Sequence, residues 1–390
     1  MNATVLAYGF RPFFLLAPLA GAAAVLPLPM IWLGWGGMWG DLSIGAWHGH
    51  EQVFGFLSAA LAGFLLTALP SWTGATPVTG RNLAGLCLLW LVGRIAFWLD
   101  PLLPPALVAA ADILFLPALL VAVVPVLRRP GPKPWEFVAA LAALAAVNAV
   151  FHLGRLGVVE VAPERAAMVA LNLFQVLIAL ALGRILPVVL RSAQIEAGRA
   201  PQVRLLPGRR HLAVTTLVLF TVAEAVAPGH AVTGWIALAA ACAQVDRMRE
   251  CHLAGALRRP QAALFYVAQG WMALGLALLG LSALGMPLDP AAARHALGLG
   301  AGATTALTVM SVVSLRHTAR PFPLPAATWG PAALVSVATA LRVAVPDLAP
   351  EAMAVAGVTI PMLLWLTAFG LWLRTFSPWL LRPRVDGCPG

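Results

Sequence analysis

Runs of about 20 apolar residues recur from one end of this chain to the other, and they limit its fold more than any other feature. Each run is about long enough to cross a lipid bilayer as one helix. Of the 390 residues, 61% are hydrophobic and only 10% are charged, against about 45–50% and about 25% in soluble globular proteins. The sequence therefore predicts an all-α, polytopic membrane protein.

Twelve candidate spans can be delimited, because each gap between apolar runs holds Gly, Pro or charged residues that interrupt a helix. No segment has the composition of a separate soluble domain, so we expect residues 1–390 to form a single integral-membrane domain. The expected spans are 10–33, 47–70, 83–99, 106–126, 135–154, 165–189, 211–227, 232–251, 262–284, 293–315, 329–346 and 351–373.

The basic residues test this count. Nineteen of the 25 fall at the two ends of the chain or in alternate gaps, and four fall in the other gaps. Cytoplasmic loops carry the excess of Lys and Arg, and a missed or extra span in mid-chain would break the alternation. The pattern predicts about twelve transmembrane helices with both termini in the cytoplasm. Because the basic residues are not gathered on one soluble surface, the net charge of +10 indicates no nucleic-acid partner.

With this topology, four histidines fall at helix ends on the outer side of the membrane. An ionisable side chain at such a position is a functional candidate, and imidazole is a common ligand of copper and haem iron. Histidines hydrated at the headgroup level are the structural alternative. The four are His48, His50, His152 and His295.

His317 falls on the opposite, cytoplasmic side. It would lie roughly a bilayer thickness, about 30 Å, from the outer histidines. The sequence therefore leaves two roles for His317, a ligand of a second cofactor or a cap at a helix end.

The densest local motif is WHGHE, from Trp47 to Glu51. On a helix, His48 and His50 would point about 200° apart, so either this segment is not helical or the two rings serve different ligands. His48 and Glu51 are three residues apart and can share a helix face. Glu51 could support a metal-bound histidine or relay protons.

Several other polar residues stand inside the predicted spans, and they indicate either a polar pocket or proton path, or ordinary interhelical hydrogen bonds worth about 0.6 kcal/mol each. Arg94 and Arg184 also lie within spans, where they could extend to the interface or pair with haem propionates. The other residues are Asp112, Asn148, Asn172, Gln175 and Glu224.

Six sequence blocks, in a fixed order and spacing, resemble the NnrS family of bacterial haem- and copper-containing membrane proteins. The resemblance extends through most of the chain. The blocks are GFRPFF at 9–14, WHGHEQVFGF at 47–56, AGFLLTALPSWTG at 62–74, NAVFHLG at 148–154, GRILPVVLRSA at 183–193, and the stretch 295–321 that ends in RHTARP.

The resemblance implies a multi-pass protein of the bacterial inner membrane, linked to denitrification and to tolerance of nitric oxide. It implies a b-type haem and copper as cofactors, with candidate ligands among five histidines. Glu51 is the catalytic candidate, and Arg11 and Trp47 of the matching blocks are further cofactor-binding candidates. The candidate haem or copper ligands are His48, His50, His152, His295 and His317.

The sequence departs from the family pattern at Gln244 and Tyr266, near positions where relatives often carry histidine. If those histidines bind a metal in relatives, this protein has lost or altered one site. The CxxCH haem-attachment motif is also missing, so a haem would be held without a covalent bond.

Three functions are compatible with these residues. The first is a redox metalloprotein that binds a small diatomic ligand, nitric oxide in particular, and takes electrons from an unknown donor. Whether nitric oxide is turned over, sensed or only bound is left open. The alternatives are a proton-coupled secondary transporter using Asp112, Glu224 and Glu51, and a membrane factor for metal delivery or assembly of denitrification enzymes.

Overall fold

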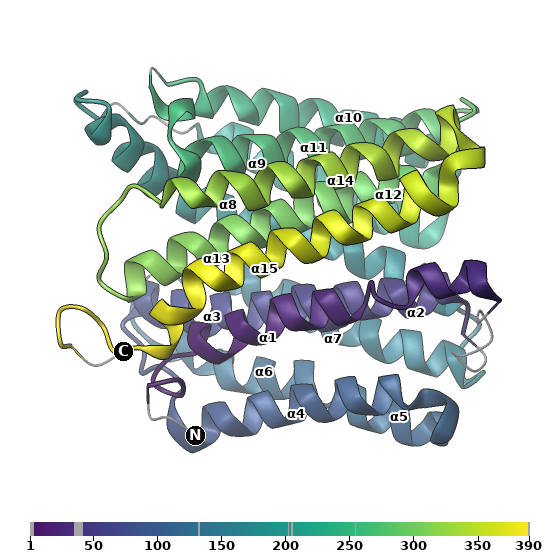
Figure 1. Cartoon of the computed structure of the whole chain (residues 1–390), viewed down its shortest axis with the longest axis horizontal. Helices are drawn as coiled ribbons and strands as arrows, with labels where there is room; N and C mark the ends of the chain where they lie inside the picture. Colours follow the sequence, from purple (N-terminus) through teal and green to yellow (C-terminus); the bar gives the residue numbers. More distant parts are fainter. Residues whose placement is uncertain are drawn as a thin grey trace. The chain divides into compact units, whose positions relative to one another are not determined.

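The computed structural model describes residues 4–34, 42–131, 133–201, 203, 206–253 and 255–388. In this part of the chain the secondary structure is helical, with no β-strand (Figure 1). The α-helices are α1 (Phe10–Ala23), α2 (Ile44–His50), α3 (Ser58–Thr73), α4 (Gly80–Trp98), α5 (Pro105–Ile113), α6 (Phe115–Val123), α7 (Trp135–Arg155), α8 (Pro163–Glu196), α9 (Pro207–Val226), α10 (Ala231–Met248), α11 (Pro260–Ala283), α12 (Pro290–His295), α13 (Thr304–His317), α14 (Trp329–Leu348) and α15 (Ile360–Leu381).

Short segments of other helix types join or extend these α-helices. The π-helical segments Glu51–Leu57, Ala296–Ala303 and Met353–Thr359 each continue directly into the next α-helix. The 3-10 segments are Leu28–Leu33, Asp100–Leu102, Val124–Arg128, Arg249–Cys251, Ala256–Arg258, Ala326–Thr328 and Pro350–Ala352.

Ten helical stretches within the described residues are long and apolar enough to cross a membrane. Six of them combine two or three of the segments above, as α2, the π-helical segment and α3 combine in Ile44–Thr73. The ten are Phe10–Met30, Ile44–Thr73, Gly80–Trp98, Pro105–Arg128, Trp135–Arg155, Pro163–Glu196, Pro260–Ala283, Pro290–His317, Ala326–Leu348 and Pro350–Leu381.

All twelve predicted spans fall on helices, but two of these helices are not among the ten apolar ones. They are α9 and α10, which correspond to the predicted spans 211–227 and 232–251. The reason is composition: α9 includes Arg209, Arg210 and Glu224, and α10 has Asp246 and Arg247 in its last turn. The all-helical, multi-pass prediction is confirmed, while the count of twelve and the orientation of the termini stay predictions.

Side-chain caps fix where some of these helices begin. Ser43 Oγ accepts a hydrogen bond from the Ala46 backbone N–H at 3.1 Å, at the start of α2. Asp289 accepts one from the Ala291 N–H at 2.8 Å, at the start of α12. Such caps satisfy backbone donors that have no partner inside the helix, so the local sequence positions the helix starts that precede His48, His50 and His295.

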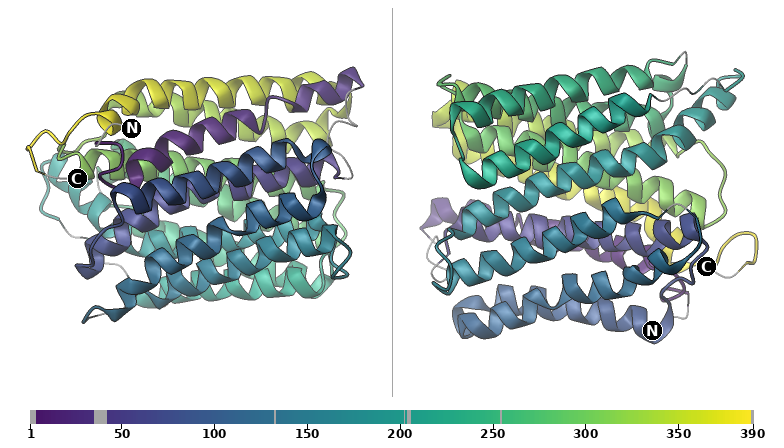
Figure 2. Two further views of the ribbon diagram at one scale, coloured as in Figure 1. Left: turned by 90° about the horizontal axis from the view of Figure 1, so that it is seen from below. Right: turned by 180° about the vertical axis from the view of Figure 1, so that it is seen from behind.

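Contacts divide the chain into two compact units. We call them unit 1 (Met1–Ala170, Val313–Arg320 and Leu373–Gly390) and unit 2 (Leu171–Val312 and Pro321–Trp372). Within each unit the long helices run alongside one another (Figures 1 and 2). The prediction of a single integral-membrane domain stays a prediction.

Small residues allow close helix packing within each unit, as is usual in membranes. In unit 1, α1 packs on α3, and a Cβ added at Gly63 would lie 2.5 Å from Phe14 Cε1. In unit 2, α10 packs on α11, and a Cβ added at Gly234 would lie 2.9 Å from the carbonyl oxygen of Gly280. Glycine at these crossings lets the helix backbones approach one another.

Candidate metal centre

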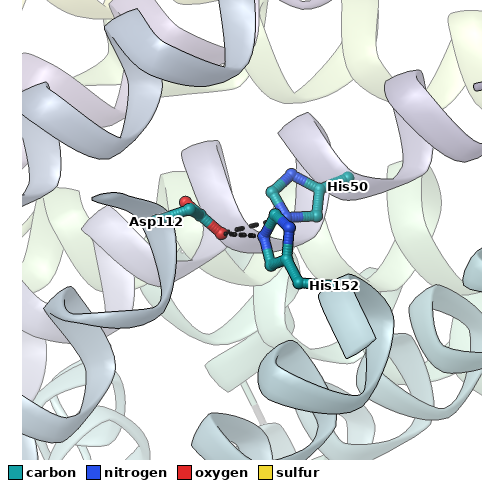
Figure 3. A group of neighbouring side chains, drawn as sticks. All are labelled: His50, Asp112 and His152. Carbon is teal, nitrogen blue, oxygen red and sulfur yellow. Dashed lines mark hydrogen bonds and ion pairs between the residues drawn. The ribbon is translucent and has the colours of Figure 1, made fainter. Parts of the chain in front are cut away.

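Two histidines and an aspartate meet inside unit 1. His50 ends α2, Asp112 lies on α5 and His152 lies near the end of α7 (Figure 3). One potential ligand atom from each lies within 4.8 Å of the others. The relative exposure of these side chains is 0% for both histidines and 3% for Asp112, so the group is shielded from the surroundings.

Asp112 Oδ2 is the centre of this group. The Nε2–H of His152 donates a hydrogen bond to it at 2.8 Å, and Asn148 Nδ2 donates another at 3.0 Å. His50 Nε2 lies 3.1 Å from the same oxygen. One carboxylate oxygen therefore faces both imidazole rings.

Three imidazole nitrogens at this site make no hydrogen bond of good geometry within the described part of the chain, although His50 Nε2 lies against Asp112 Oδ2. They are both ring nitrogens of His50 and Nδ1 of His152. Because Nε2 of His152 donates to Asp112, the neutral His152 ring carries its lone pair on Nδ1. Each neutral ring has one nitrogen lone pair to offer a ligand, and buried polar atoms are normally paired.

Arg94 on α4 joins the two carboxylates of the site. Its Nη1 donates to Glu51 Oε1 and its Nη2 to Asp112 Oδ1. Glu51 also accepts a hydrogen bond from Trp98 Nε1 at 2.9 Å, and its Oε1 lies 3.5 Å from His50 Nδ1. The guanidinium group thus holds Glu51 and Asp112 on either side of His50.

The charges of this group do not cancel. Two carboxylates face one guanidinium, and each imidazole lies against a carboxylate but must be neutral to bind a metal. The site therefore carries one net negative charge. A buried charge of this kind is costly unless a counter-ion is present, which favours a bound cation.

Aromatic rings hold His50 in place. The His50 ring stacks on Phe97 with 3.9 Å between centroids and 16° between planes, and it also contacts Phe54 (4.9 Å) and Phe151 (4.5 Å). Trp47 lies in the same buried cluster as Phe97 and Phe151. This packing fixes the orientation of the imidazole before any ligand binds.

Close packing of α4 against α5 brings Arg94 to Asp112. A Cβ added at Gly93 would lie 3.1 Å from both Cα and Oδ1 of Asp112. The neighbouring helix ends are also joined by an ion pair, in which Arg155 Nη2 donates to Asp100 Oδ2 at 2.8 Å. Glycine at position 93 is therefore part of the site's geometry although it has no functional group.

The local backbone changes at the motif itself. The α-helical turn that ends at His50 is followed directly by the π-helical segment Glu51–Leu57. Such segments often occur at functional sites. The transition falls between the two residues of the WHGHE motif that take part in the cluster.

Comparison with known proteins identifies the family. A model of the NnrS protein family matches residues 4–384. This chain belongs to the NnrS family. No curated protein matches it. Membership of the NnrS family indicates a membrane protein related to nitric oxide.

Of the histidines predicted from the sequence of this NnrS protein, His50 and His152 come together. His48 points elsewhere: its Nδ1 lies 3.1 Å from the Ala24 carbonyl oxygen. Since α2 is helical, the alternative in which the two histidines of the motif face different partners is the one observed. The predicted shared face of His48 and Glu51 does not form the site, because Glu51 contacts His50, Arg94 and Trp98.

His295 lies in unit 2, with both ring nitrogens in hydrogen-bond contact. Its Nδ1 lies 2.7 Å from the Ala291 carbonyl oxygen, and Arg342 Nη2 lies 3.0 Å from its Nε2. Since arginine can only donate, Nε2 accepts and Nδ1 carries the hydrogen. A bound metal at His295 would have to replace the Arg342 contact.

His317 and Arg11 lie in unit 1, away from the carboxylates of the cluster. The His317 ring contacts Tyr8 and Phe10. Arg11 is fully buried, and its Nη1 donates to the backbone oxygens of Leu380 and Arg382, each at 2.8 Å.

The two departures from the family pattern lie in unit 2. Gln244 Nε2 donates to the Ala213 carbonyl oxygen at 3.1 Å. The Tyr266 hydroxyl lies 3.0 Å from His252 Nε2. Gln244 therefore joins α10 to α9, and Tyr266 joins α11 to the segment that follows α10.

Sequence reasoning recognised Asp112 and Asn148 as buried polar residues but did not join them to the histidines. It left Arg94 to extend to the interface or to bind propionates, whereas the structure pairs Arg94 with Glu51 and Asp112. The usable signal was the charge itself, because charged residues inside a span tend to pair with one another. The one arginine and two acids of the second, third and fourth predicted spans are the members of one network.

Proposed function

We propose that this NnrS protein binds a copper ion at His50, Asp112 and His152, and that the metal site acts in nitric oxide metabolism or nitrosative-stress tolerance. The observation that carries the proposal is the buried group of two imidazoles and a carboxylate with ligand atoms within 4.8 Å. Family membership supports the connection with nitric oxide.

The donor set fits a copper ion. Imidazole suits copper, zinc, iron and nickel, and a carboxylate completes a mixed nitrogen–oxygen set. The neutral rings of His50 and His152 each provide one lone pair, and the net negative charge of the site favours a cation. When bound, the copper would supply a coordination position for a small diatomic molecule such as nitric oxide.

The same residues do not fit a porphyrin. His50 Nε2 faces Asp112 Oδ2 at 3.1 Å, and its ring faces are packed by Phe97 and Phe151. A haem bound through His50 would have to occupy the space of the carboxylate and of the His152 ring. The b-type haem therefore stays a prediction from family resemblance, and we assign no residue of this cluster to it.

The surrounding residues have distinct roles in this proposal. Arg94 positions both carboxylates, Asn148 orients Asp112, and Phe97 orients the His50 ring. Glu51, hydrogen-bonded to Arg94 and Trp98, is the proposed proton acceptor next to His50. An electron donor, not identified by these contacts, is needed if nitric oxide is reduced.

We further propose twelve spans, with α9 and α10 crossing the bilayer beside more apolar helices and both termini in the cytoplasm. The support is the distribution of basic residues between alternate gaps, nineteen against four. By family resemblance the membrane is the bacterial inner membrane, and lipid is the first partner of the chain.

The test is to purify the full chain in detergent, measure iron and copper, and record oxidised and dithionite-reduced spectra with and without nitric oxide. We expect near-stoichiometric copper that is lost in His50→Ala and retained in His48→Ala, its neighbour on the other face of α2. A reduced spectrum typical of a b-type haem would support the haem prediction, and a spectrum without haem bands would contradict it. A folded, metal-free protein that takes up no copper would overturn the proposal.

A further inference from the structure

Three distant segments of the chain converge at one end of unit 1. They are the start of α1, the end of α13 and the end of α15 with the residues that follow it (Figure 1). The His317 ring lies 5.7 Å from the Tyr8 ring and 5.8 Å from the Phe10 ring, centroid to centroid. The Val385 backbone N–H donates to the Thr318 carbonyl oxygen at 3.4 Å, so the terminal segment lies against the end of α13.

Arg11 has a structural role in this arrangement. Besides its bonds to Leu380 and Arg382, Nη1 lies 3.3 Å from the Trp379 carbonyl oxygen. The last carbonyls of a helix have no partner within it and form the negative end of its dipole. Arg11 therefore caps α15 and holds the terminal segment beside Tyr8.

The resulting group, which we call the terminal basic cluster, consists of Tyr8, His317, Arg320, Arg382 and Arg384. Arg320 rests on the Trp379 ring, 4.6 Å from Cζ to the centroid, and its described hydrogen bond goes to a backbone oxygen. The described residues provide these three arginines with one ion pair, between Arg384 and Asp386 at 2.6 Å. The cluster therefore carries an excess of positive charge.

This excess decides which ligand the cluster prefers. The imidazole of His317 makes no hydrogen bond within the described part of the chain, so its ring nitrogens can bind a ligand. Arg316 and Arg384 are the charges that act on it, and both repel a metal cation. Burial raises the pKa of the Tyr8 hydroxyl, although the charge of Arg384 acts to lower it. The hydroxyl therefore stays protonated and adds a hydrogen-bond donor to the cluster.

The location of the cluster suggests the source of an anion. One apolar stretch begins at Phe10, a second ends at His317 and a third ends at Leu381. Residues at such ends lie at the level of the lipid headgroups in either orientation of the chain. Trp379, beside Arg320, is the type of residue that is enriched at this level.

We propose that the terminal basic cluster binds the phosphate group of an anionic phospholipid. Arginine side chains recognise phosphate with paired, charge-assisted hydrogen bonds, and basic segments next to a span bind anionic headgroups. Arg320 and Arg384 would bind the phosphate oxygens, with Tyr8 and His317 completing the site. This role differs from the metal-ligand role that family resemblance implies for His317.

The experiment is native mass spectrometry of the full chain in mild detergent, titrated with phosphatidylglycerol. The test variant is Arg320→Gln/Arg384→Gln. The control is Arg128→Gln/Arg129→Gln, which removes two exposed arginines at the end of another apolar stretch of unit 1. We expect lipid binding about 25-fold weaker in the test variant, about five-fold for each arginine, and unchanged in the control.

Several outcomes would overturn the proposal. An equal loss of lipid binding in both double variants would indicate general charge attraction. Equally strong binding of phosphatidylcholine would show that the cluster does not recognise an anionic lipid. Displacement of the lipid by millimolar inorganic phosphate would show a site for free phosphate instead. If the double variant does not fold, Tyr8→Phe keeps every charge and should weaken binding about ten-fold. Copper content should stay unchanged in all these variants, which separates this test from that of the metal centre.

Discussion

Replacement of Asp112 by asparagine gives the sharpest test of the metal centre. The substitution keeps the size of the side chain and removes the charge that faces both imidazoles. Asp112 is at once a potential ligand and the hydrogen-bond partner of His152 (2.8 Å) and Asn148 (3.0 Å). Loss of an outer partner of a metal-bound histidine costs about 10–100-fold in affinity. Loss of a direct ligand should cost at least as much as the upper end of this range, so copper affinity should fall by at least about 100-fold, or about 3 kcal/mol.

The control is Asp100→Asn, which also breaks a buried aspartate–arginine pair in unit 1. Asp100 pairs with Arg155, and splitting such a pair costs about 3–5 kcal/mol. In Asp112→Asn, Arg94 keeps its bond to Glu51, so the loss of stability should be smaller, about 1.5–3 kcal/mol. Asp100→Asn should therefore be the less stable variant but the one that keeps its copper.

The assay is titration of the purified variants against a copper chelator, together with thermal unfolding of the metal-free proteins. Copper affinity in Asp112→Asn within a few-fold of the unchanged protein would refute the reasoning. Equal copper loss in both variants would also do so, because it would tie metal binding to stability alone. If Asp100→Asn does not fold, Glu224→Gln replaces it as the control, since Glu224 pairs with Arg294 in unit 2 at 2.7 Å.

Three further predictions follow from packing and hydrogen bonding. Gly93→Ala should lower copper affinity by about 10-fold or more, measured by the same titration, because its methyl group would press on Asp112 and displace a ligand. His48→Ala should leave the copper content measured by metal analysis unchanged, because its ring faces another helix; loss of copper would contradict the assignment. Gly63→Ala should lower the free energy of unfolding by about 1–3 kcal/mol through overpacking against Phe14, and an unchanged melting temperature would show that α1 can move away.

Much of the candidate site was present in the sequence as separate signals. The WHGHE motif pointed to His50 and Glu51, and the apolar context marked Asp112, Asn148 and Arg94 as costly to bury. The sequence could not say which acid pairs with which cation, because Glu51, Arg94 and Asp112 lie on three different spans. Depth in the membrane grouped four histidines together, yet His48 faces the Ala24 carbonyl and His295 contacts Arg342. Equal depth does not fix the rotation of a helix about its axis.

The sequence by itself determined the all-helical, membrane-spanning architecture and the family of this protein. Lipid supplies no hydrogen bonds to the backbone, so long apolar runs must satisfy their backbone groups internally as helices, and this requirement can be recognised without knowledge of any contact. The tertiary structure alone decided the chemistry of the buried groups. It brought His50, Asp112 and His152 within reach of one ion and placed His317 beside arginines. These outcomes depend on how helices rotate and pack, and local residue pattern does not specify either.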